Sequence, residues 1–458
     1  MMRDKLDQKL GYGQVFDIKR RIISFNNQEL TIYFSSFLVD NDNIVQLLLG
    51  FIETNYHDDT FGNKSVLAHL ANHNLTVEEN LDIIVTSILS GLVAIVINDE
   101  TSVIVLDLRN YPGRSIGEPD SEKVVRGSRD GFTESIATNM GLIRRRIRSG
   151  RLRSEVFQIG DYSKTDVALI YLDEFVDQKA LNDARDKIKN VRTVDLTMSD
   201  KALEELIADN NLSPYPLVRY TERPDTFVAH LYQGAFGILV DTSPSAILAP
   251  TTIFDHMQHA EEFRQTPISG TYLRILRMIG IILSFLLMPI WFTVIESDIE
   301  IPSFFSKVFS YEGTKNYVFL QIILAEVGLE LLRMASIHTP NSLSTSMGLI
   351  AGVIIGDIAI ELGLFTPAIV LIGSISAIGS FITPSYELSL ANKIVKLILL
   401  FLIKFFGIYG FISGLILLII HLATRKSFTR PYLYPLIPFS FKNLIKQLIR
   451  FPYRNKQH

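Results

Sequence analysis

Hydrophobic and polar positions follow different patterns in the two parts of the chain. Residues 1–265 mix charged and apolar positions in short stretches, whereas every long apolar run lies after Leu273. A helix needs about 20 apolar residues to cross the hydrocarbon core of a bilayer. The pattern therefore predicts an α/β domain over 1–265, an α-helical transmembrane bundle over 266–424 and a basic tail over 425–458.

Two similar successions of elements follow one another in the α/β part. The strand pattern LTIYFSSFLVD, which begins at Leu30, precedes two helical runs and a hairpin around Asn98 and Asp99. The strand pattern VALIYLDEFVD, which begins at Val167, precedes a similar succession, whose hairpin lies around Asp241. The near-constant offset between them predicts an internal duplication, with two unrelated α/β segments as the alternative.

The duplication sets the expected domain boundaries. A first α/β copy spans 1–115, an arginine-rich linker region spans 116–155, and a second copy spans 156–265. In this alignment the motif Val15–Ile18 pairs with Val156–Ile159. The start of the chain has no apolar core of signal-peptide length, so we expect this duplicated domain to stay in the cytoplasm.

The linker region ends in a segment rich in arginine, for which we expect a helix. Six arginines lie within ten residues there: Arg144, Arg145, Arg146, Arg148, Arg151 and Arg153. Such a cluster can bind anionic lipid head groups or the acidic surface of a neighbouring subunit. The alternative is a solvated helix face that pairs internally with Asp and Glu. No aromatic residues are interleaved for base stacking and the net charge is −4, so we expect no nucleic-acid partner.

Motifs for catalysis are missing from the sequence. It has no phosphate-binding loop, no nucleophile elbow and no HExxH motif, and it contains no cysteine. Disulfides, thiolate metal sites and a cysteine nucleophile are therefore excluded. His256 and His259 have a spacing that can bind a metal, but a polar surface helix is the more common explanation. We expect a protein that is not an enzyme and that has no cofactor or metal.

Five apolar stretches are candidates for membrane helices. They are Leu273–Ile295, Tyr317–Leu332, Met347–Leu364, Pro367–Phe381 and Ile394–Ile420. The last exceeds one span, and Gly407 and Gly410 can break it into a tilted or re-entrant pair. Arg274, Arg277 and the tail are expected on the cytoplasmic side, and two cytoplasmic ends require an even number of crossings. The tail segment SFKNLIKQLIRF predicts a helix that lies on the inner membrane surface.

Acidic residues within these stretches are the strongest indication of function. They form two pairs, each on one helix face: Glu326 with Glu330, and Asp357 with Glu361. A charged side chain at the bilayer centre costs about 2.5–3.5 kcal/mol, so these faces should avoid lipid. They either line an ion path or pair with basic residues such as Arg333, Lys396 or Lys404.

Small residues follow a helical spacing beside one of these acidic faces. Gly348, Gly352 and Gly356 are four residues apart and precede Asp357. Glycines on one face let neighbouring helices approach closely. The spacing favours a helix that packs tightly and lines a pore.

Several long motifs occur in register over nearly the whole chain. They are TERPDTF, DTSPSAILAPTTIF, LLRMASIHTP, STSMGLIAGVIIGDIAI and ITPSYELSLANKIVK. This succession resembles the A-subunit family of spore germination receptors, the GerA family. The segments LDLRNYPGRSIGEPDSEKVVRGSRDGFTESI and HAEEFRQTP are similar to one subgroup, which is associated with the locus for dipicolinic acid transport and lacks the usual set of receptor partners.

The resemblance implies a function in spore germination. It implies a multi-pass protein of the inner spore membrane, with the N-terminal domain and the tail on the core side. The protein would form an oligomeric, pentameric channel for monovalent cations, in contact with membrane lipids, a second small membrane subunit and germination receptors. It also implies a pore or packing role for Gly348–Glu361 and a family signature at Pro384, Ser385 and Tyr386.

Two other functions stay open at this point. One is a non-conducting scaffold that regulates germination receptors or the dipicolinic acid channel. The other is a secondary transporter, in which intramembrane acids bind coupling ions.

Overall fold

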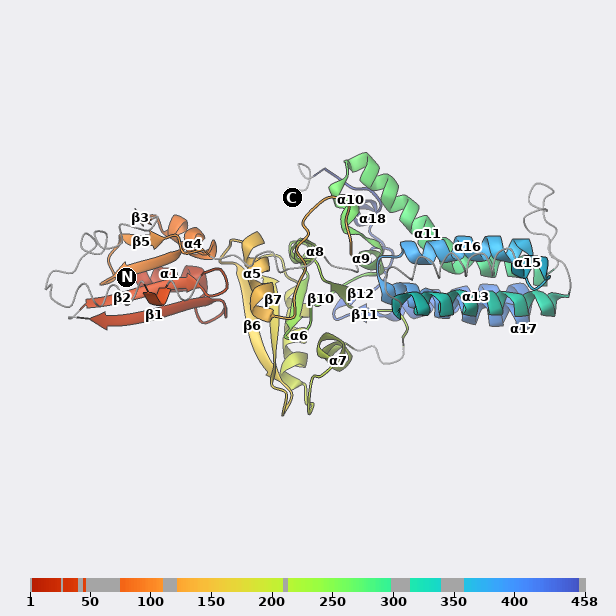
Figure 1. Cartoon of the computed structure of the whole chain (residues 1–458), viewed down its shortest axis with the longest axis horizontal. Coiled ribbons are helices and arrows are strands. Elements are labelled where there is room, and N and C mark those ends of the chain that lie inside the picture. The colour runs from red at the N-terminus through yellow and green to blue at the C-terminus, as the bar shows by residue number, and fades with distance from the viewer. Residues whose placement is uncertain are drawn as a thin grey trace. The chain divides into compact units, whose positions relative to one another are not determined.

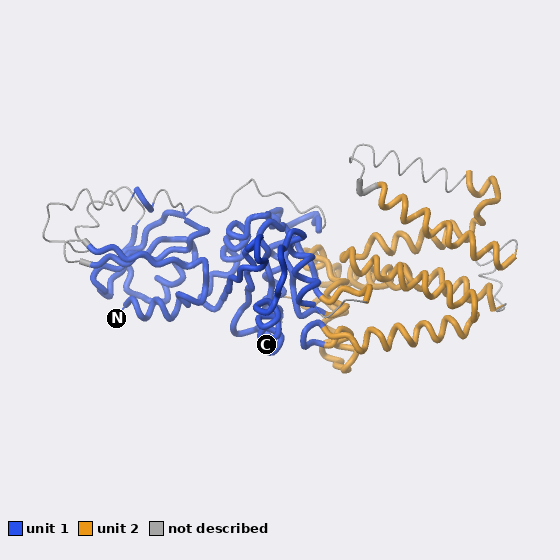
Figure 2. Tube along the Cα trace, turned by 90° about the horizontal axis from the view of Figure 1, so that it is seen from below, with its two compact units in different colours: residues 1–211, 218–251, 427–430 blue, residues 212–217, 252–426, 431–458 orange. Residues whose placement is uncertain are grey.

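The computed structural model describes most of the chain as two compact units (Figure 2). The described residues are 2–25, 28–39, 44–46, 75–109, 122–208, 213–297, 314–338 and 358–452. Unit 1 comprises 1–211, 218–251 and 427–430, and unit 2 comprises 212–217, 252–426 and 431–458.

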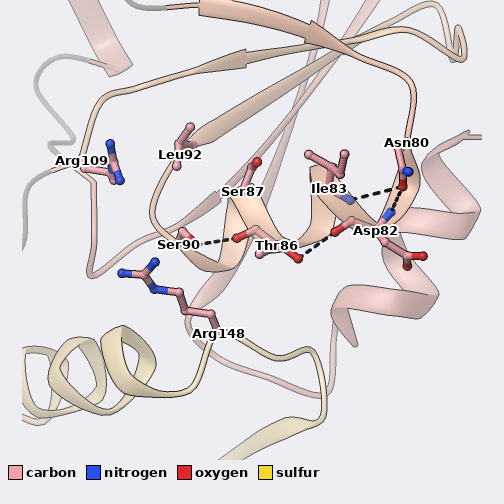
Figure 3. Close-up of a pocket in the computed structure, with 9 residues that line it drawn as sticks. All are labelled: Asn80, Asp82, Ile83, Thr86, Ser87, Ser90, Leu92, Arg109 and Arg148. Carbon is pink, nitrogen blue, oxygen red and sulfur yellow. Dashed lines mark hydrogen bonds between the residues drawn. The ribbon is translucent and has the colours of Figure 1, made fainter.

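Unit 1 begins with an antiparallel sheet in the order β1-β2-β4-β5-β3. Its strands are β1 (Ile18–Phe25), β2 (Gln28–Ser35), β3 (Leu75–Glu78), β4 (Val93–Ile97) and β5 (Val103–Leu106). Helices α1 (Met2–Leu10) and α4 (Leu81–Leu89) pack on one face, where Leu6 and Ile84 meet Tyr33 in a buried cluster. Asn80 caps α4, because its side chain accepts a hydrogen bond from the backbone N–H of Asp82 at 2.9 Å (Figure 3).

The second sheet has the order β6-β7-β9-β10-β8. Its strands are β6 (Leu152–Ile159), β7 (Thr165–Leu172), β8 (Arg219–Thr221), β9 (Phe236–Val240) and β10 (Ala246–Ala249). On one face α5 (Ile136–Arg146) and α8 (Pro224–Leu231) bury Met140 and Phe227. On the other, α6 (Gln178–Asn190) and α7 (Ser199–Ile207) bury Leu181 and Leu203. Helices on both faces explain why β9 is apolar at every position.

The two sheets, drawn as arrows in Figure 1, have the same strand order, which confirms the predicted α/β duplication. Both predicted hairpins exist, and Asn98 and Asp99 have φ values of 48° and 59°, as a tight two-residue turn requires. The predicted pairing of Val15–Ile18 with Val156–Ile159 is wrong. The first motif leads into β1, whereas the second forms the end of β6.

Unit 2 is helical. It contains α9 (Ile253–Met257), α10 (Ala260–Arg264), α11 (Pro267–Glu296), α13 (Lys315–His338), α15 (Ala359–Glu361), α16 (Pro367–Ile382), α17 (Tyr386–Thr424) and α18 (Phe441–Leu448). A two-stranded sheet of β11 (Lys426–Ser427) and β12 (Arg430–Pro431) lies between α17 and α18 in the sequence. Four of the five predicted apolar stretches coincide with α11, α13, α16 and α17. The stretch Met347–Leu364 lies largely outside the described residues.

Two of the described helices, α11 and α17, are long and apolar enough to cross a membrane. Helix α11 runs antiparallel to α16, since Ser376 Oγ donates a hydrogen bond to the Ser284 carbonyl at 2.6 Å while Gly379 packs on the backbone of Gly280. A Cβ at Gly379 would collide with the Gly280 carbonyl oxygen. The glycines therefore allow the two backbones to touch.

Helix α17 is a helical hairpin. Gly407 has φ 55° and ψ −135°, which interrupts the helix. Beyond it, Gly410 packs on the backbone of Leu402, and Gly414 packs on the side chain of Leu399. Residues 15 positions apart lie more than 20 Å apart in a straight helix, at about 1.5 Å per residue, so the chain must turn back. The predicted break of this long stretch at Gly407 is confirmed.

The basic tail contains the predicted helix, α18. Arg274 of α11 donates hydrogen bonds to the carbonyls of Lys446 and Gln447, at 3.3 and 3.0 Å, and so satisfies the end of α18. No residue of α18 is buried, and Phe439, Phe441 and Phe451 are exposed around it. Its contact with a membrane surface stays a prediction.

Candidate ion path in the helical bundle

Charged side chains meet between α13 and the first arm of α17. The Lys396 ammonium lies 2.6 Å from Glu326 Oε2, and the two side chains are 3% and 10% exposed. Lys396 Nζ also donates to Ser376 Oγ of α16 at 3.0 Å. Three helices thus converge on one buried ammonium group.

Further polar contacts extend this cluster along the same helices. Glu330 pairs with Lys393, one turn away on each helix. Arg333 donates to Ser389 Oγ at 3.4 Å. The sequence numbers rise along α13 as they fall along α17, so the two helices are antiparallel. These contacts form a ladder, which we call the α13–α17 ladder.

A separate ion pair links α11 to the same face of α17. Lys404 Nζ lies 3.2 Å from Glu296 Oε1, near the break at Gly407. Lys393, Lys396 and Lys404 lie within a quarter turn of one another on a helix with 3.6 residues per turn. One face of α17 therefore contributes the basic partner in all three pairs.

Two oxygen atoms of α13 are left without partners. Within the part of the chain that the structure describes, neither Glu326 Oε1 nor Gln321 Oε1 accepts a hydrogen bond, although both atoms are buried. An unmatched buried acceptor costs about 1–3 kcal/mol and needs an explanation. Carboxylate and carbonyl oxygens are the groups with which cation pores replace water around an ion. Glu326 is therefore the best candidate for an ion-binding group in the described bundle.

The four acidic residues that the sequence singled out lie in different surroundings. Glu326 and Glu330 both lie in the α13–α17 ladder, and their partners include Lys396, which the sequence suggested, and Lys393, which it did not. Glu361 is exposed at the end of α15. Asp357 lies outside the described residues, as do three predicted packing glycines: Gly348, Gly352 and Gly356. Their pore and packing roles stay predictions.

The family signature occupies the connection between α16 and α17. Pro384 and Ser385 lie in the connecting turn, and Ser385 Oγ accepts a hydrogen bond from the Leu388 N–H at 3.2 Å, which caps α17. Tyr386 lies under the guanidinium of Arg333, 4.7 Å from the ring centroid. The signature thus fixes the start of the helix that holds Lys393 and Lys396.

The arginine segment differs from the expected helix. Helix α5 ends at Arg146, and Arg153 already belongs to β6. Arg148 and Arg151 lie in the turn between the helix and the strand. Arg144 is buried and forms a two-pronged ion pair with Asp17 of the first copy, at 2.8 and 3.1 Å. This pair joins the two copies.

Three other arginines of the segment also have acidic partners. Arg146 pairs with Asp130 at 2.6 Å, and the partners of Arg151 and Arg153 are Glu174 and Asp173. Arg145 and Arg148 are exposed. Contact of the segment with lipid or a neighbouring subunit stays a prediction.

Sequence reasoning missed Asp17, Glu296 and Lys393. Lys393 could have been found, because it lies three residues before Lys396 and so shares a helix face with it, as the two acids four residues apart on α13 do. Asp17 had no such signal, since its partner is 127 residues away. The two histidines with metal-like spacing have other contacts: His259 Nδ1 accepts from the Glu261 N–H at 3.2 Å, and His256 lies beside the ring of Tyr432.

Comparison with known proteins decides the family. The family model for the Bacillus/Clostridium GerA spore germination protein matches residues 4–458. The chain belongs to the GerA family. It is 44% identical to stage V sporulation protein AF of Bacillus subtilis, over 96% of this chain and 90% of the relative. It is 33% identical to spore germination protein A1 of Bacillus subtilis, over 81% and 78%.

Two further comparisons concern the membrane and the fold. The chain is 31% identical to the uncharacterized membrane protein YfkQ of Bacillus subtilis, over 83% of this chain and 74% of the relative. The crystal structure of the N-terminal domain of the A subunit of the Bacillus megaterium spore germinant receptor GerK3 matches with a TM-score of 0.42 and 26% identity, over 54% of this chain and 91% of that one.

Membership in the GerA family establishes the general function. The chain is a membrane protein of spore germination and sporulation, and it is not an enzyme.

Proposed function

We propose that this GerA-family protein is a subunit of an oligomeric complex that conducts monovalent cations across the spore membrane during germination. The observation that supports this most is the buried Lys396–Glu326 pair with its unmatched carboxylate oxygen. Charged groups inside a membrane are costly and tend to mark ion pathways. We propose that the pathway runs along the α13–α17 ladder.

The described conformation would be closed to cations. The ammonium of Lys396 already neutralises Glu326 and would repel a cation that approaches it. Opening must therefore separate Lys396 from Glu326, so that a K⁺ or Na⁺ ion takes the place of the ammonium. Movement of α17 against α13 is sufficient for this, since each residue of the pair belongs to a different helix.

The surroundings of the complex belong to the same proposal. The N-terminal domain and the tail lie on the core side of the inner spore membrane, with Arg274 and Arg277 at that surface. Identical subunits assemble into a ring, a pentamer by family resemblance. A second small membrane subunit and germination receptors supply the signal, and lipid contacts the exposed aromatic residues around α18.

The decisive experiment measures flux and assembly together. The purified full-length protein is reconstituted into liposomes, alone and with co-expressed membrane partners, and K⁺ and Na⁺ flux are recorded separately. Native mass spectrometry of the detergent-purified protein, before reconstitution, gives the oligomer mass. We expect a closed oligomer that passes monovalent cations. An intact oligomer that stays silent with every partner would contradict the proposal.

A non-conducting scaffold is the second candidate, and one observation favours it. Each acidic residue of α13 in the ladder already has a lysine partner, as expected of ion pairs that only hold helices together. Such a scaffold would bind germination receptors or the dipicolinic acid channel without passing ions. A silent oligomer that co-purifies with one of them would support it.

A further inference from the structure

Two short segments of the chain belong to a different unit from the elements that precede them in the sequence (Figure 2). Residues 212–217 lie between α7 and β8, which are parts of unit 1, but these residues belong to unit 2. Residues 427–430 follow α17 of unit 2, but they belong to unit 1. Each segment therefore carries the chain out of one unit, into the other and back.

The first of these segments, 213–217, binds both arms of the α17 hairpin, and we call it the Tyr215 strap. Tyr215 is 2% exposed, and its hydroxyl donates a hydrogen bond to Asn392 Oδ1 of the first arm at 3.2 Å. Ser213 Oγ lies within hydrogen-bond distance of His421 Nε2 of the second arm, at 2.9 Å. The strap therefore contacts α17 close to both ends of the hairpin.

The contact with Asn392 lies beside the candidate ion path. Asn392 precedes Lys396 by four residues, so the two side chains lie on the same face of α17, one turn apart. Leu217 of the strap is buried in the same apolar cluster as Leu388 and Val395 of the first arm. A displacement of the strap therefore acts on the turns of α17 that carry Lys396.

The strap has no slack where it joins unit 1. Leu217 belongs to a buried cluster of unit 2, and the next residue, Val218, belongs to a buried cluster of the second sheet. Strand β8 begins one residue later, at Arg219. Because consecutive Cα atoms are held about 3.8 Å apart, a shift of β8 has to be passed on to Leu217.

The second segment connects the other end of α17 to the same α/β copy. Ser427, three residues after the end of α17, is fully buried, and its Oγ accepts a hydrogen bond from the Thr251 N–H at 2.9 Å. Phe428 packs edge-on against Phe236 of β9, with ring centroids 5.2 Å apart. Both arms of α17 are therefore connected to the second α/β copy.

We propose that the Tyr215 strap couples the second α/β copy to the Lys396–Glu326 pair. The hydrogen bond from Tyr215 to Asn392 holds the first arm of α17 in its described position. Lys396 can leave Glu326 only if this bond breaks or if β8 moves with the arm. The inference rests on the proposed function, because it assigns the control of that ion path to one segment. A change of conformation in the second copy thus reaches the ion path through β8.

The first test compares K⁺ flux through two tyrosine variants of the full-length protein in liposomes without partners. Tyr215→Phe keeps the buried ring but removes the hydroxyl, and it should raise flux by about fivefold, as expected for the loss of one hydrogen bond. Tyr171→Phe removes a 2.8 Å hydrogen bond to Glu155 elsewhere in the same copy and should leave flux unchanged. An equal rise in both variants would contradict a specific role of Tyr215.

The second test needs no ion flux. Hydrogen exchange of amides 386–396 is measured in nanodiscs after one fully buried leucine is truncated in either copy. Leu203→Ala loosens the second sheet at α7, the helix before the strap, and should speed exchange by about tenfold. Leu6→Ala loosens the first sheet and should not change it. In the background of Tyr215→Phe, Leu203→Ala should speed exchange no further, since the connection is already lost.

The two tests separate the strap from ion conduction. If no variant passes cations but the exchange results hold, the strap is confirmed and the conducting function is contradicted. Equal exchange in Leu203→Ala and Leu6→Ala would overturn the strap whether or not the protein conducts, as would an undiminished effect of Leu203→Ala beside Tyr215→Phe. Should Leu203→Ala fail to fold, Ile207→Val makes a smaller change in the same cluster, with Ile32→Val of the first sheet as its control.

Discussion

Two buried ion pairs, one in each unit, are built in different ways. In unit 1, Arg144 contacts both oxygens of Asp17, at 2.8 and 3.1 Å, and these side chains are 1% and 0% exposed. In unit 2, Lys396 contacts one oxygen of Glu326 at 2.6 Å, and the other oxygen has no described partner. The first carboxylate is fully satisfied, and the second is not.

This difference separates a structural contact from a candidate functional one. The guanidinium fork matches a carboxylate in two places, whereas an ammonium is a compact charge that moves on a flexible chain. An ion pair that only joins two elements is most stable when every polar atom of both side chains has a partner, because each buried polar atom without one costs free energy. Glu326 keeps an open acceptor in an apolar bundle, which is what an exchangeable cation would use.

The largest expected effect is the loss of stability when the Arg144–Asp17 pair is broken. Arg144→Met leaves Asp17 buried without its partner and should destabilise the junction of the two copies by about 3–5 kcal/mol. Hydrogen exchange of β1 and α5 amides in the intact protein measures this. The double variant Asp17→Leu, Arg144→Met should recover most of the loss, and a single variant as stable as the unmodified protein would show that Arg144 does not join the copies.

A smaller loss of stability is expected from a change in the helical hairpin of α17, whose first arm contains Lys396. Gly410→Ala places a Cβ against the carbonyl of Leu402 and should cost about 1–3 kcal/mol, because backbone cannot move aside easily. Resistance of the reconstituted protein to denaturing detergent gives the change in stability. Gly328→Ala on α13 is the matched control.

The control should change stability in the opposite direction. No described atom lies within 4 Å of a Cβ at Gly328, so alanine there should stabilise α13 by about 0.5–1 kcal/mol. If Gly410→Ala and Gly328→Ala behaved alike, the two arms of α17 would not pack as described.

The smallest effect is a pH dependence in the second copy. Burial alone would raise the pKa of Glu155, but hydrogen bonds from Arg185 and Tyr171 outweigh it and hold the pKa below 4.5. Because the pKa of Glu155 is lower in the folded protein than in the unfolded chain, its ionised carboxylate stabilises the fold at pH values above the unfolded-state pKa. This stabilisation is lost as the pH falls through the folded-state pKa. The group is partly exposed, so we expect less than about 1 kcal/mol.

Arg185→Gln tests this directly. It removes hydrogen bonds to Glu155 of 2.6 and 2.8 Å, so the variant should show a smaller drop in Tm between pH 7 and pH 4 than the unmodified protein. An unchanged drop would mean that other carboxylates account for the acid sensitivity of unit 1.

Much of the fold could be predicted because it depends on local patterns. The β-branched runs with turn residues at Asn98 and Asp99 specify a hairpin wherever they occur, and the apolar runs specify helices by length alone. The break at Gly407 was predictable for the same reason, since the apolar stretch is too long for one span. The equal strand order of the two sheets follows from the repeated succession of elements.

The contacts between distant residues could not be predicted. Which residues of β1 correspond to which residues of β6 depends on how each strand pairs within its own sheet, and a motif match at Val15–Ile18 does not contain that information. Glu326 offered several basic partners of equal merit, and only the packing of α13 on α17 selects Lys396. Asp17 had no periodic signal at all, because it lies in a connecting segment.

The most direct test of the central claim compares K⁺ flux through Glu326→Gln and Lys396→Gln in the same liposomes. The double variant Glu326→Gln, Lys396→Gln serves as the control for assembly. If cations pass Glu326, loss of the carboxylate should lower flux and loss of the ammonium should raise it. Equal losses in both single variants, with intact oligomers, would show that the pair only holds α13 and α17 together and would contradict the ion path.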